Sequence, residues 1–171
     1  MEKDILLAIH SYANPLLDTI VPVVTAAAAP VFVAAFAVAI GLVYVYRRRW
    51  AWAALWLGGV AGAGAIAYAL KHMLSRARPE LWDRLTVETG YSLPSGHATA
   101  SMAVALCAIV LLWHTKWRTL AVVLGSIYVV AIGLTRLYLG VHYPTDILAG
   151  WLLAAGWIVI VAAVVRRRQI R

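Results

Sequence analysis

Three short polar segments interrupt an otherwise apolar chain, and they hold the side chains that could do chemistry. The first, KHMLSRARP, places Lys71 and Arg78 seven residues apart. On a helix this spacing is about two turns, or about 10 Å, along one face. Two long basic side chains would then reach one anion between them. Taken alone, the segment equally fits basic side chains that extend towards lipid head groups.

The second segment, PSGH, holds Pro94, Ser95, Gly96 and His97 directly before a long apolar run. Ser95 is a favourable N-cap, so the pattern predicts that a helix begins here. The start of a helix presents free backbone N–H groups and the positive end of the helix dipole, which suit an anion. His97 would project from the first turn. A capped helix with an incidental histidine is the alternative for this segment.

The third segment, TRLYLGVHYPTD, places Arg136 six residues before His142 and Asp146 four residues after it. Pro144 suits the first position of a helix, which would place Asp146 in the first turn near His142. A carboxylate bonded to one imidazole nitrogen fixes the tautomer and leaves the other nitrogen as a nucleophile. A purely structural His–Asp contact is the alternative.

Together the three segments describe the surroundings of one phosphoryl group: basic side chains, a helix start and two histidines. A metal site is disfavoured, because the only metal-ligating side chains in these motifs are His97, His142 and Asp146. Three basic residues accompany them and would repel a cation. The sequence therefore predicts phosphate chemistry without a metal or another cofactor.

The elements that must position these residues are membrane helices. Of the 171 residues, 64% are hydrophobic, against about 45–50% in soluble domains, and the mean hydropathy is +0.84. The length suits one domain over residues 1–171, and no removable signal peptide is expected. A bilayer core of about 30 Å needs about 20 helical residues. The apolar runs that approach or reach this length cover residues 30–46, 51–70, 98–113, 120–135 and 147–165.

Residues 4–20 mix apolar and polar positions, which is typical of a helix lying in the membrane interface. The expected fold is therefore all-α and integral to the membrane: a transmembrane bundle of five spans plus an N-terminal interfacial helix. Six spans is the alternative. Cys107 is the single cysteine, so no internal disulfide forms, and it is expected in the core or facing lipid.

The net charge of +8 divides between the two ends of these spans. One set of basic residues indicates the cytoplasmic side by the positive-inside rule, which also makes the C-terminus cytoplasmic: Arg47, Arg48, Arg49, Lys116, Arg118, Arg166, Arg167, Arg168 and Arg171. The opposite, extracytoplasmic side holds Lys71, Arg76, Arg78, Arg84 and Arg136. Basic residues are disfavoured there and need another reason, which anion binding supplies for Lys71, Arg78 and Arg136. Nucleic acid is not an expected partner.

With these residues in view, the sequence resembles the type 2 phosphatidic acid phosphatase (PAP2) superfamily. The signatures of that family are a lysine, six residues and Arg-Pro; then Pro-Ser-Gly-His; then Ser-Arg, five residues, His, three residues and Asp. The chain repeats all three in the same order over residues 71–146. One position departs from the family pattern, because Thr135 stands where serine is usual.

The resemblance implies a metal-independent membrane lipid phosphatase, with a role for each matching residue. His142 would attack phosphorus and form a phosphohistidine, Asp146 would orient it, and His97 would protonate the leaving oxygen. The residues implied in phosphate binding are Lys71, Arg78, Arg136, Ser95 and Gly96. The implied substrate is a lipid phosphate at the outer face of the plasma membrane, first of all undecaprenyl diphosphate. Phosphatidylglycerophosphate, phosphatidic acid and lipid A 1-phosphate are the alternatives.

Two other classes of protein fit parts of the pattern. A transporter or channel would use buried Arg, His and Asp side chains, but it needs them near the middle of the bilayer. An oxidase resembling the vanadium haloperoxidases would share the motifs, but those proteins are soluble. The loop over residues 80–93 is long enough only for a small lid, in which Leu81, Trp82 and Leu85 are candidates for contact with lipid.

Overall fold

The computed structural model describes residues 1–83, 85–86 and 88–169, and within them it contains helices and no strand. Arg84 and Arg171 lie outside the described residues, as does the side chain of Arg168. The helices are α1 (Glu2–His10), α2 (Pro15–Ala26), α3 (Pro30–Tyr46), α4 (Trp50–Leu74), α5 (Gly96–Leu112), α6 (Arg118–Tyr138) and α7 (Pro144–Gln169). The all-helical membrane fold predicted from the sequence is confirmed.

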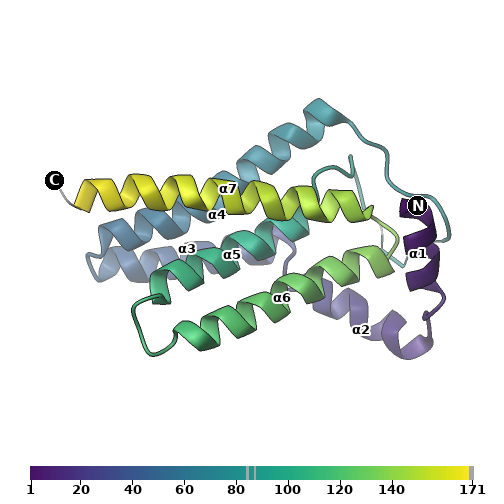
Figure 1. Cartoon of the computed structure of the whole chain (residues 1–171), viewed down its shortest axis with the longest axis horizontal. Helices are drawn as coiled ribbons and strands as arrows, with labels where there is room; N and C mark the ends of the chain where they lie inside the picture. The colour runs from purple at the N-terminus through teal and green to yellow at the C-terminus, as the bar shows by residue number, and fades with distance from the viewer. Residues whose placement is uncertain (84, 87, 170–171) are drawn as a thin grey trace.

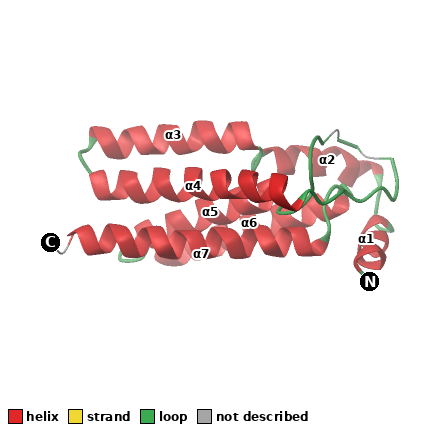
Figure 2. Ribbon diagram, turned by 90° about the horizontal axis from the view of Figure 1, so that it is seen from above, coloured by secondary structure: helices red, strands yellow, loops and turns green. Residues whose placement is uncertain are grey.

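Helix α5 is the centre of the bundle, because it packs against α4, α6 and α7. Helix α3 lies against α4, and α2 lies against α6. The long helices run side by side, while α1 lies across one end of the bundle (Figures 1 and 2). Cys107 of α5 is fully buried and belongs to the same apolar cluster as Leu55 and Trp56 of α4 and Ile158 of α7. It is therefore a core residue.

Three helices are long and apolar enough to cross a membrane: α4, α6 and α7 over Pro144–Arg167. Helices α2 and α3 pass the same test together, bent by 41° at the break between them, and would add a fourth span. Helix α5 is apolar but has 17 residues, which is short for a complete crossing. Among the described residues, length and composition thus indicate three or four spans.

The interfacial segment predicted over residues 4–20 is two helices rather than one. Helix α1 ends at His10, and Asn14 caps α2 by accepting hydrogen bonds from the N–H groups of Leu16 at 3.1 Å and Leu17 at 3.0 Å. Pro15 occupies the first turn of α2, where its missing N–H costs nothing. The Asn-Pro pair therefore starts a second helix and separates α1 from it.

The two ends of the bundle differ in charge as the sequence predicts. The α3–α4 connection, the α5–α6 connection and the C-terminus lie at one end, and these carry the arginine-rich clusters (Figure 1). The α4–α5 loop, the α6–α7 turn and α1 lie at the other end. The three polar segments singled out from the sequence therefore meet at the end without those clusters.

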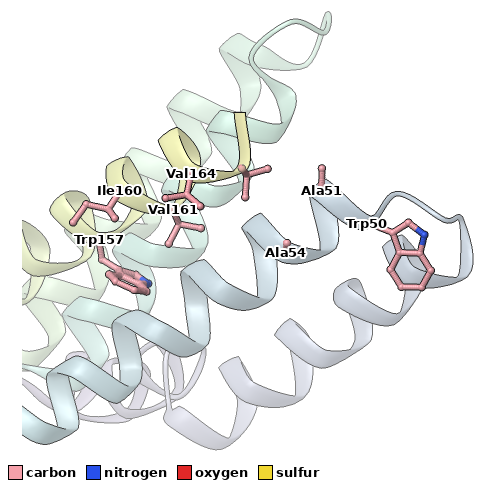
Figure 3. A pocket seen from close by; sticks show the side chains of 8 residues that line it. Trp50, Ala51, Ala54, Trp157, Ile160, Val161 and Val164 are labelled. Carbon is pink, nitrogen blue, oxygen red and sulfur yellow. The ribbon is translucent and has the colours of Figure 1, made fainter. Parts of the chain in front are cut away.

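An apolar cavity of about 520 Å³ opens between α4 and α7 at the arginine-rich end (Figure 3). Its lining residues are Trp50, Ala51, Ala54, Trp157, Ile160, Val161, Val164 and Val165. They come from the first turns of α4 and the later turns of α7, whereas Lys71 and Asp146 lie at the opposite ends of these two helices. This cavity is therefore separate from the polar segments.

Candidate active site

Lys71 and Arg78 reach the same place, but not from one helix. Helix α4 ends at Leu74, and Ser75 follows in a left-handed conformation with φ of 47°. Arg78 then lies in an irregular segment before Pro79, which disfavours a helical conformation of the preceding residue. The prediction that both basic residues share one helical face is therefore wrong.

The α4–α5 loop, residues 75–95, brings the two basic side chains together again. Lys71 Nζ donates to the carbonyl oxygen of Tyr91 at 2.6 Å, and Arg78 Nε donates to that of Gly90 at 3.0 Å. Both acceptors come a few residues before the PSGH segment. The first and second motifs are thus joined through the loop between them.

The imidazole of His142 lies between a cation and a carboxylate. Arg78 Nη1 lies 3.2 Å from Nε2 of His142 and also donates to the carbonyl oxygen of Val141 at 2.9 Å. Because a guanidinium can only donate, Nε2 must accept and carries the lone pair. Nδ1 then holds the proton and faces Oδ2 of Asp146 at 3.4 Å. The structure thus forms the predicted His–Asp pair and leaves Nε2 unprotonated.

Asp146 is fully buried in the first turn of α7, as predicted. Its Oδ2 accepts the backbone N–H of Tyr143 at 2.9 Å, and its Oδ1 accepts from Arg76 Nη1 at 2.7 Å. A carboxylate is favourable near the start of a helix, where the dipole is positive. The helix start, the backbone and one guanidinium therefore all stabilise the ionised form.

Ser95 caps α5, and its Oγ accepts from the N–H of Ala98 at 3.4 Å. The backbone N–H of Ser95 donates to the carbonyl oxygen of Asp146 at 3.0 Å, which joins the start of α5 to that of α7. In the described part of the chain, and apart from its own neighbours and helix backbone, no heavy atom lies within 4 Å of the position that a Cβ on Gly96 would take. The start of α5, from which half-buried His97 projects, therefore faces open space.

Glu88 lies among the basic side chains of the site, and its position there was not predicted from the sequence. Arg136 is 1% exposed, and its Nη2 forms an ion pair with Oε1 of Glu88 while Nη1 donates to Thr25 Oγ1 at 3.1 Å. The other oxygen of Glu88 lies 3.8 Å from Arg78 Nη2. Nε of Arg136 is buried and has no hydrogen-bond partner within the described residues. One carboxylate thus binds two of the arginines predicted to bind phosphate.

Electrostatics keep His142 neutral and Glu88 charged. Burial, with Arg136 and Arg78 nearby, lowers the pKa of His142 to about 4, although Asp146 acts in the opposite direction. Burial also opposes ionisation of Glu88, but Arg136 outweighs it and holds the pKa of that carboxyl below its usual range. At neutral pH, His142 is a neutral imidazole beside cationic arginines.

Two further sequence expectations are refined by the structure. Thr135 Oγ1 donates to the carbonyl oxygen of Ile132 at 2.7 Å, so its hydroxyl is used within α6. Trp82 stacks on the ring of His10 at 3.9 Å and lies over Gly140, whose φ of 65° belongs to the α6–α7 turn. Trp82 therefore fastens the α4–α5 loop to α1 and to that turn rather than extending into lipid.

A metal centre has no obvious place among these residues. Within residues 1–83, 85–86 and 88–169, no three His, Cys, Asp or Glu side chains gather in a way that could hold a metal ion. The charged groups nearest His142 are the guanidinium groups of Arg78 and Arg136, which suit an anion, and the carboxylate of Asp146.

A family profile for the PAP2 superfamily matches residues 50–170, which include all three polar segments. The chain belongs to the PAP2 superfamily. A PAP2 relative from Sulfolobus acidocaldarius, named undecaprenyl-diphosphatase, is 45% identical over 71 residues, covering 41% of this chain and 31% of the relative. Phosphatidylglycerophosphatase B of Bacillus subtilis is 34% identical over 89 residues, covering 49% and 43%. The chain thus matches less than half the length of these two relatives.

The PAP2 fold is confirmed by a solved structure. A crystal structure titled as a transmembrane PAP2 type phosphatidylglycerolphosphate phosphatase from Bacillus subtilis superposes with a TM-score of 0.87 at 27% identity. The superposition covers 97% of this chain and 85% of that one. The arrangement of helices that brings the polar segments together is therefore that of a PAP2 protein.

Proposed function

We propose that the protein is a membrane lipid phosphatase that transfers a phosphoryl group first to His142 and then to water. The observation that carries the proposal is that the unprotonated Nε2 of His142 lies close to arginines that already bind an oxyanion, the carboxylate of Glu88. Glu88 lies between Arg136 and Arg78, and Arg78 also contacts that nitrogen at 3.2 Å. The arginines that bind this carboxylate have the chemistry to bind a phosphate.

The phosphate takes the place of the Glu88 carboxylate. Its oxygens accept from Arg136 and Arg78, and the unpartnered Nε of Arg136 gains a buried acceptor. Lys71, the hydroxyl of Ser95 and the N–H of Gly96 at the start of α5 complete the set. These groups neutralise the charge that develops on the equatorial oxygens during transfer, which is the larger part of catalysis in phosphoryl transfer.

The first chemical step forms one bond and breaks one. Nε2 of His142 attacks phosphorus, the bond from phosphorus to the leaving oxygen breaks, and His97, which must be protonated in the substrate complex, gives that oxygen its proton. Asp146 holds the Nδ1–H of the histidine and stabilises its developing positive charge. In the second step, water attacks phosphorus and gives a proton to His97, the N–P bond breaks, and inorganic phosphate leaves. The basic side chains carry the role that a metal ion has in many phosphatases.

The proposed substrate is a lipid phosphate or diphosphate, and undecaprenyl diphosphate is the first candidate. Its support is the position of the site at one end of membrane helices and the name of the Sulfolobus acidocaldarius relative. Phosphatidylglycerophosphate is the second candidate, by the names of the Bacillus subtilis proteins. Phosphatidic acid and lipid A 1-phosphate share the same reacting group.

We place this chain in the plasma membrane as one domain over residues 1–171, with five spans and the interfacial α1. The site then faces the extracytoplasmic side, and the arginine-rich end and the C-terminus are cytoplasmic. The support is the separation of the basic clusters from the site along the bundle. The partners are the lipid substrate and membrane lipids rather than nucleic acid.

The test is phosphate release by the purified protein in detergent, from a panel of these lipids and in the presence of EDTA. We expect turnover, and we expect His142→Ala to lower kcat by about 1,000-fold or more because the nucleophile is lost. His114→Ala, which removes an exposed histidine at the arginine-rich end, is the control and should keep wild-type activity. Near-wild-type turnover by His142→Ala, or complete dependence on a divalent metal, would contradict the mechanism.

A further inference from the structure

Arg76 contacts the active-site carboxylate, although it is not one of the motif residues assigned above. Its Nη1 donates to Oδ1 of Asp146 at 2.7 Å and to Oγ1 of Thr145 at 2.7 Å. The guanidinium carbon lies 4.2 Å from the centre of the Tyr143 ring, so one face of the cation is covered. A charge-assisted hydrogen bond to a fully buried carboxylate is among the strong polar contacts in a protein.

Glu2 of α1 binds Arg76 from the other side. Its Oε2 accepts from Arg76 Nη2 at 2.8 Å, and its Oε1 accepts from the hydroxyl of Thr145 at 2.6 Å and from the N–H of Thr145 at 3.2 Å. Thr145 is in the first turn of α7, so Glu2 also satisfies one of the free N–H groups there. A side chain 143 residues earlier in sequence thus caps the helix that carries Asp146.

The two oxygens of Asp146 have separate partners, and this separation fixes the carboxylate. Oδ2 faces Nδ1 of His142 at 3.4 Å and accepts the N–H of Tyr143, while Oδ1 is bound by Arg76. The terminal torsion of an aspartate has broad preferences and is easily turned. Without the guanidinium, Oδ1 loses its only charged partner among the described hydrogen bonds. The carboxylate would then turn away from the histidine.

We propose that Arg76 is a positioning residue for the Asp146–His142 pair, and that Glu2 positions Arg76. Helix α1 is then part of the catalytic machinery as well as a membrane-surface element. The inference rests on the proposed phosphatase function, since it assigns Arg76 a role through His142. Arg76 acts through Asp146 and not on the substrate, because its guanidinium is bound by Thr145 and Asp146 on one side and by Glu2 on the other.

A double-mutant cycle on phosphate release tests this role. We expect Arg76→Ala to lower kcat about 10-fold to 100-fold while KM stays within about twofold, because the positioning of the nucleophile is lost and substrate contacts remain. Glu2→Gln keeps an oxygen for Thr145 and loses the charge that faces Arg76, so we expect a smaller loss. In the Arg76→Ala background, Glu2→Gln should have no further effect.

Matched controls separate this role from general damage. Asp4→Asn changes an exposed acid of the same helix, and Arg118→Ala removes a basic residue at the far end of the bundle; both should keep wild-type kcat. Arg76→Lys keeps a positive donor and should recover part of the lost kcat. Orthovanadate should inhibit Arg76→Ala as it inhibits the wild type, which would show an intact anion site. If Arg76→Ala fails to fold, Arg76→Lys and Glu2→Gln carry the test.

Three results would overturn the inference: wild-type kcat in Arg76→Ala, an increase of KM with unchanged kcat, or losses from Arg76 and Glu2 that multiply. The second would place Arg76 against the substrate. Each of them leaves the proposed function standing, provided that the wild type releases phosphate and His142→Ala does not. A wild type without phosphatase activity would overturn the function itself.

Discussion

His142 illustrates how the neighbours of a single residue determine which of its nitrogens carries the proton. Its Nδ1 faces Asp146, and its Nε2 faces Arg78, which can only donate. Arg78 therefore keeps Nε2 free of a proton. In the proposed mechanism, this is the nitrogen that attacks phosphorus.

The ionisation of His142 gives a prediction at this scale. Its pKa of about 4 lies below the ordinary value for histidine, about 6.5, so the neutral imidazole persists as the pH falls from 6.5 towards 4. Protonation below that range removes the nucleophile. A pH titration of the histidine 15N signals in detergent should place this transition well below pH 6.5. The spectrum of His142→Gln identifies the signal, and a midpoint above pH 6.5 would contradict the structure.

The motif residues were predictable from the sequence, but two important partners were not. Spacing alone placed Asp146 beside His142, because four residues at a helix start bring two side chains together. Glu88 belongs to an irregular loop, and its position against Arg136 depends on how that loop folds back. The only signal was an acidic residue in the loop at the end that carries the candidate site. Nothing in the sequence around Arg76 indicated that it contacts Asp146 and Glu2, because both partners come from distant parts of the chain.

At the scale of elements, helix starts were easier to predict than helix ends. Ser95 and Pro144 are residue types with a strong preference for the start of a helix, and α5 and α7 begin there. The end of α4 depends on a left-handed Ser75, a conformation that serine rarely adopts. The spacing of Lys71 and Arg78 therefore suggested one helix, whereas the helix ends between these two residues.

Gly150 controls how closely α7 approaches the start of α5. A Cβ at this position would lie 2.8 Å from the carbonyl oxygen of Ser95 and 2.9 Å from Oγ1 of Thr99. The first of these atoms belongs to the backbone and has little freedom to move. The missing side chain is what allows the N–H of Ser95 to reach the carbonyl oxygen of Asp146.

Gly150→Ala should therefore push the two helices apart. We expect a loss of about 1–3 kcal/mol in stability, as for other overpacked sites, together with a lower kcat because Asp146 moves relative to the start of α5. Thermal unfolding in detergent and phosphate release measure the two effects. The control is Gly156→Ala on the same helix, where no described atom lies within 4 Å of the new Cβ. Equal stability and activity in both variants would contradict this account of the helix contact.

At the scale of the whole molecule, the bundle has two chemically different ends. Arginine-rich connections and tryptophans gather at one end, where Arg49 lies 4.8 Å from the ring of Trp52 and Arg118 lies 4.7 Å from that of Trp113. The candidate site and α1 lie at the other. The long helices therefore cross the membrane between the basic clusters at one end and the candidate site at the other.

Cysteine labelling tests the orientation of these two ends. In intact cells, a membrane-impermeant maleimide should label Asp83→Cys, in the α4–α5 loop, and should label Lys116→Cys only after the membrane is opened. Both positions are exposed, whereas native Cys107 is fully buried, so the wild type serves as the unlabelled control. Labelling of both variants in intact cells would refute the two-sided topology.

Helix α7 links the two ends without a break, so its length sets the distance between them. It begins at Pro144, two residues before Asp146, and has 26 residues. At 1.5 Å per residue, a hydrocarbon layer of about 30 Å takes about 20 of them, which brings Arg166 and Arg167 out among the head groups of the opposite leaflet. In the proposed topology, these guanidinium groups lie at the cytoplasmic surface, and the length of α7 sets the distance from that surface to the proposed site of phosphate cleavage.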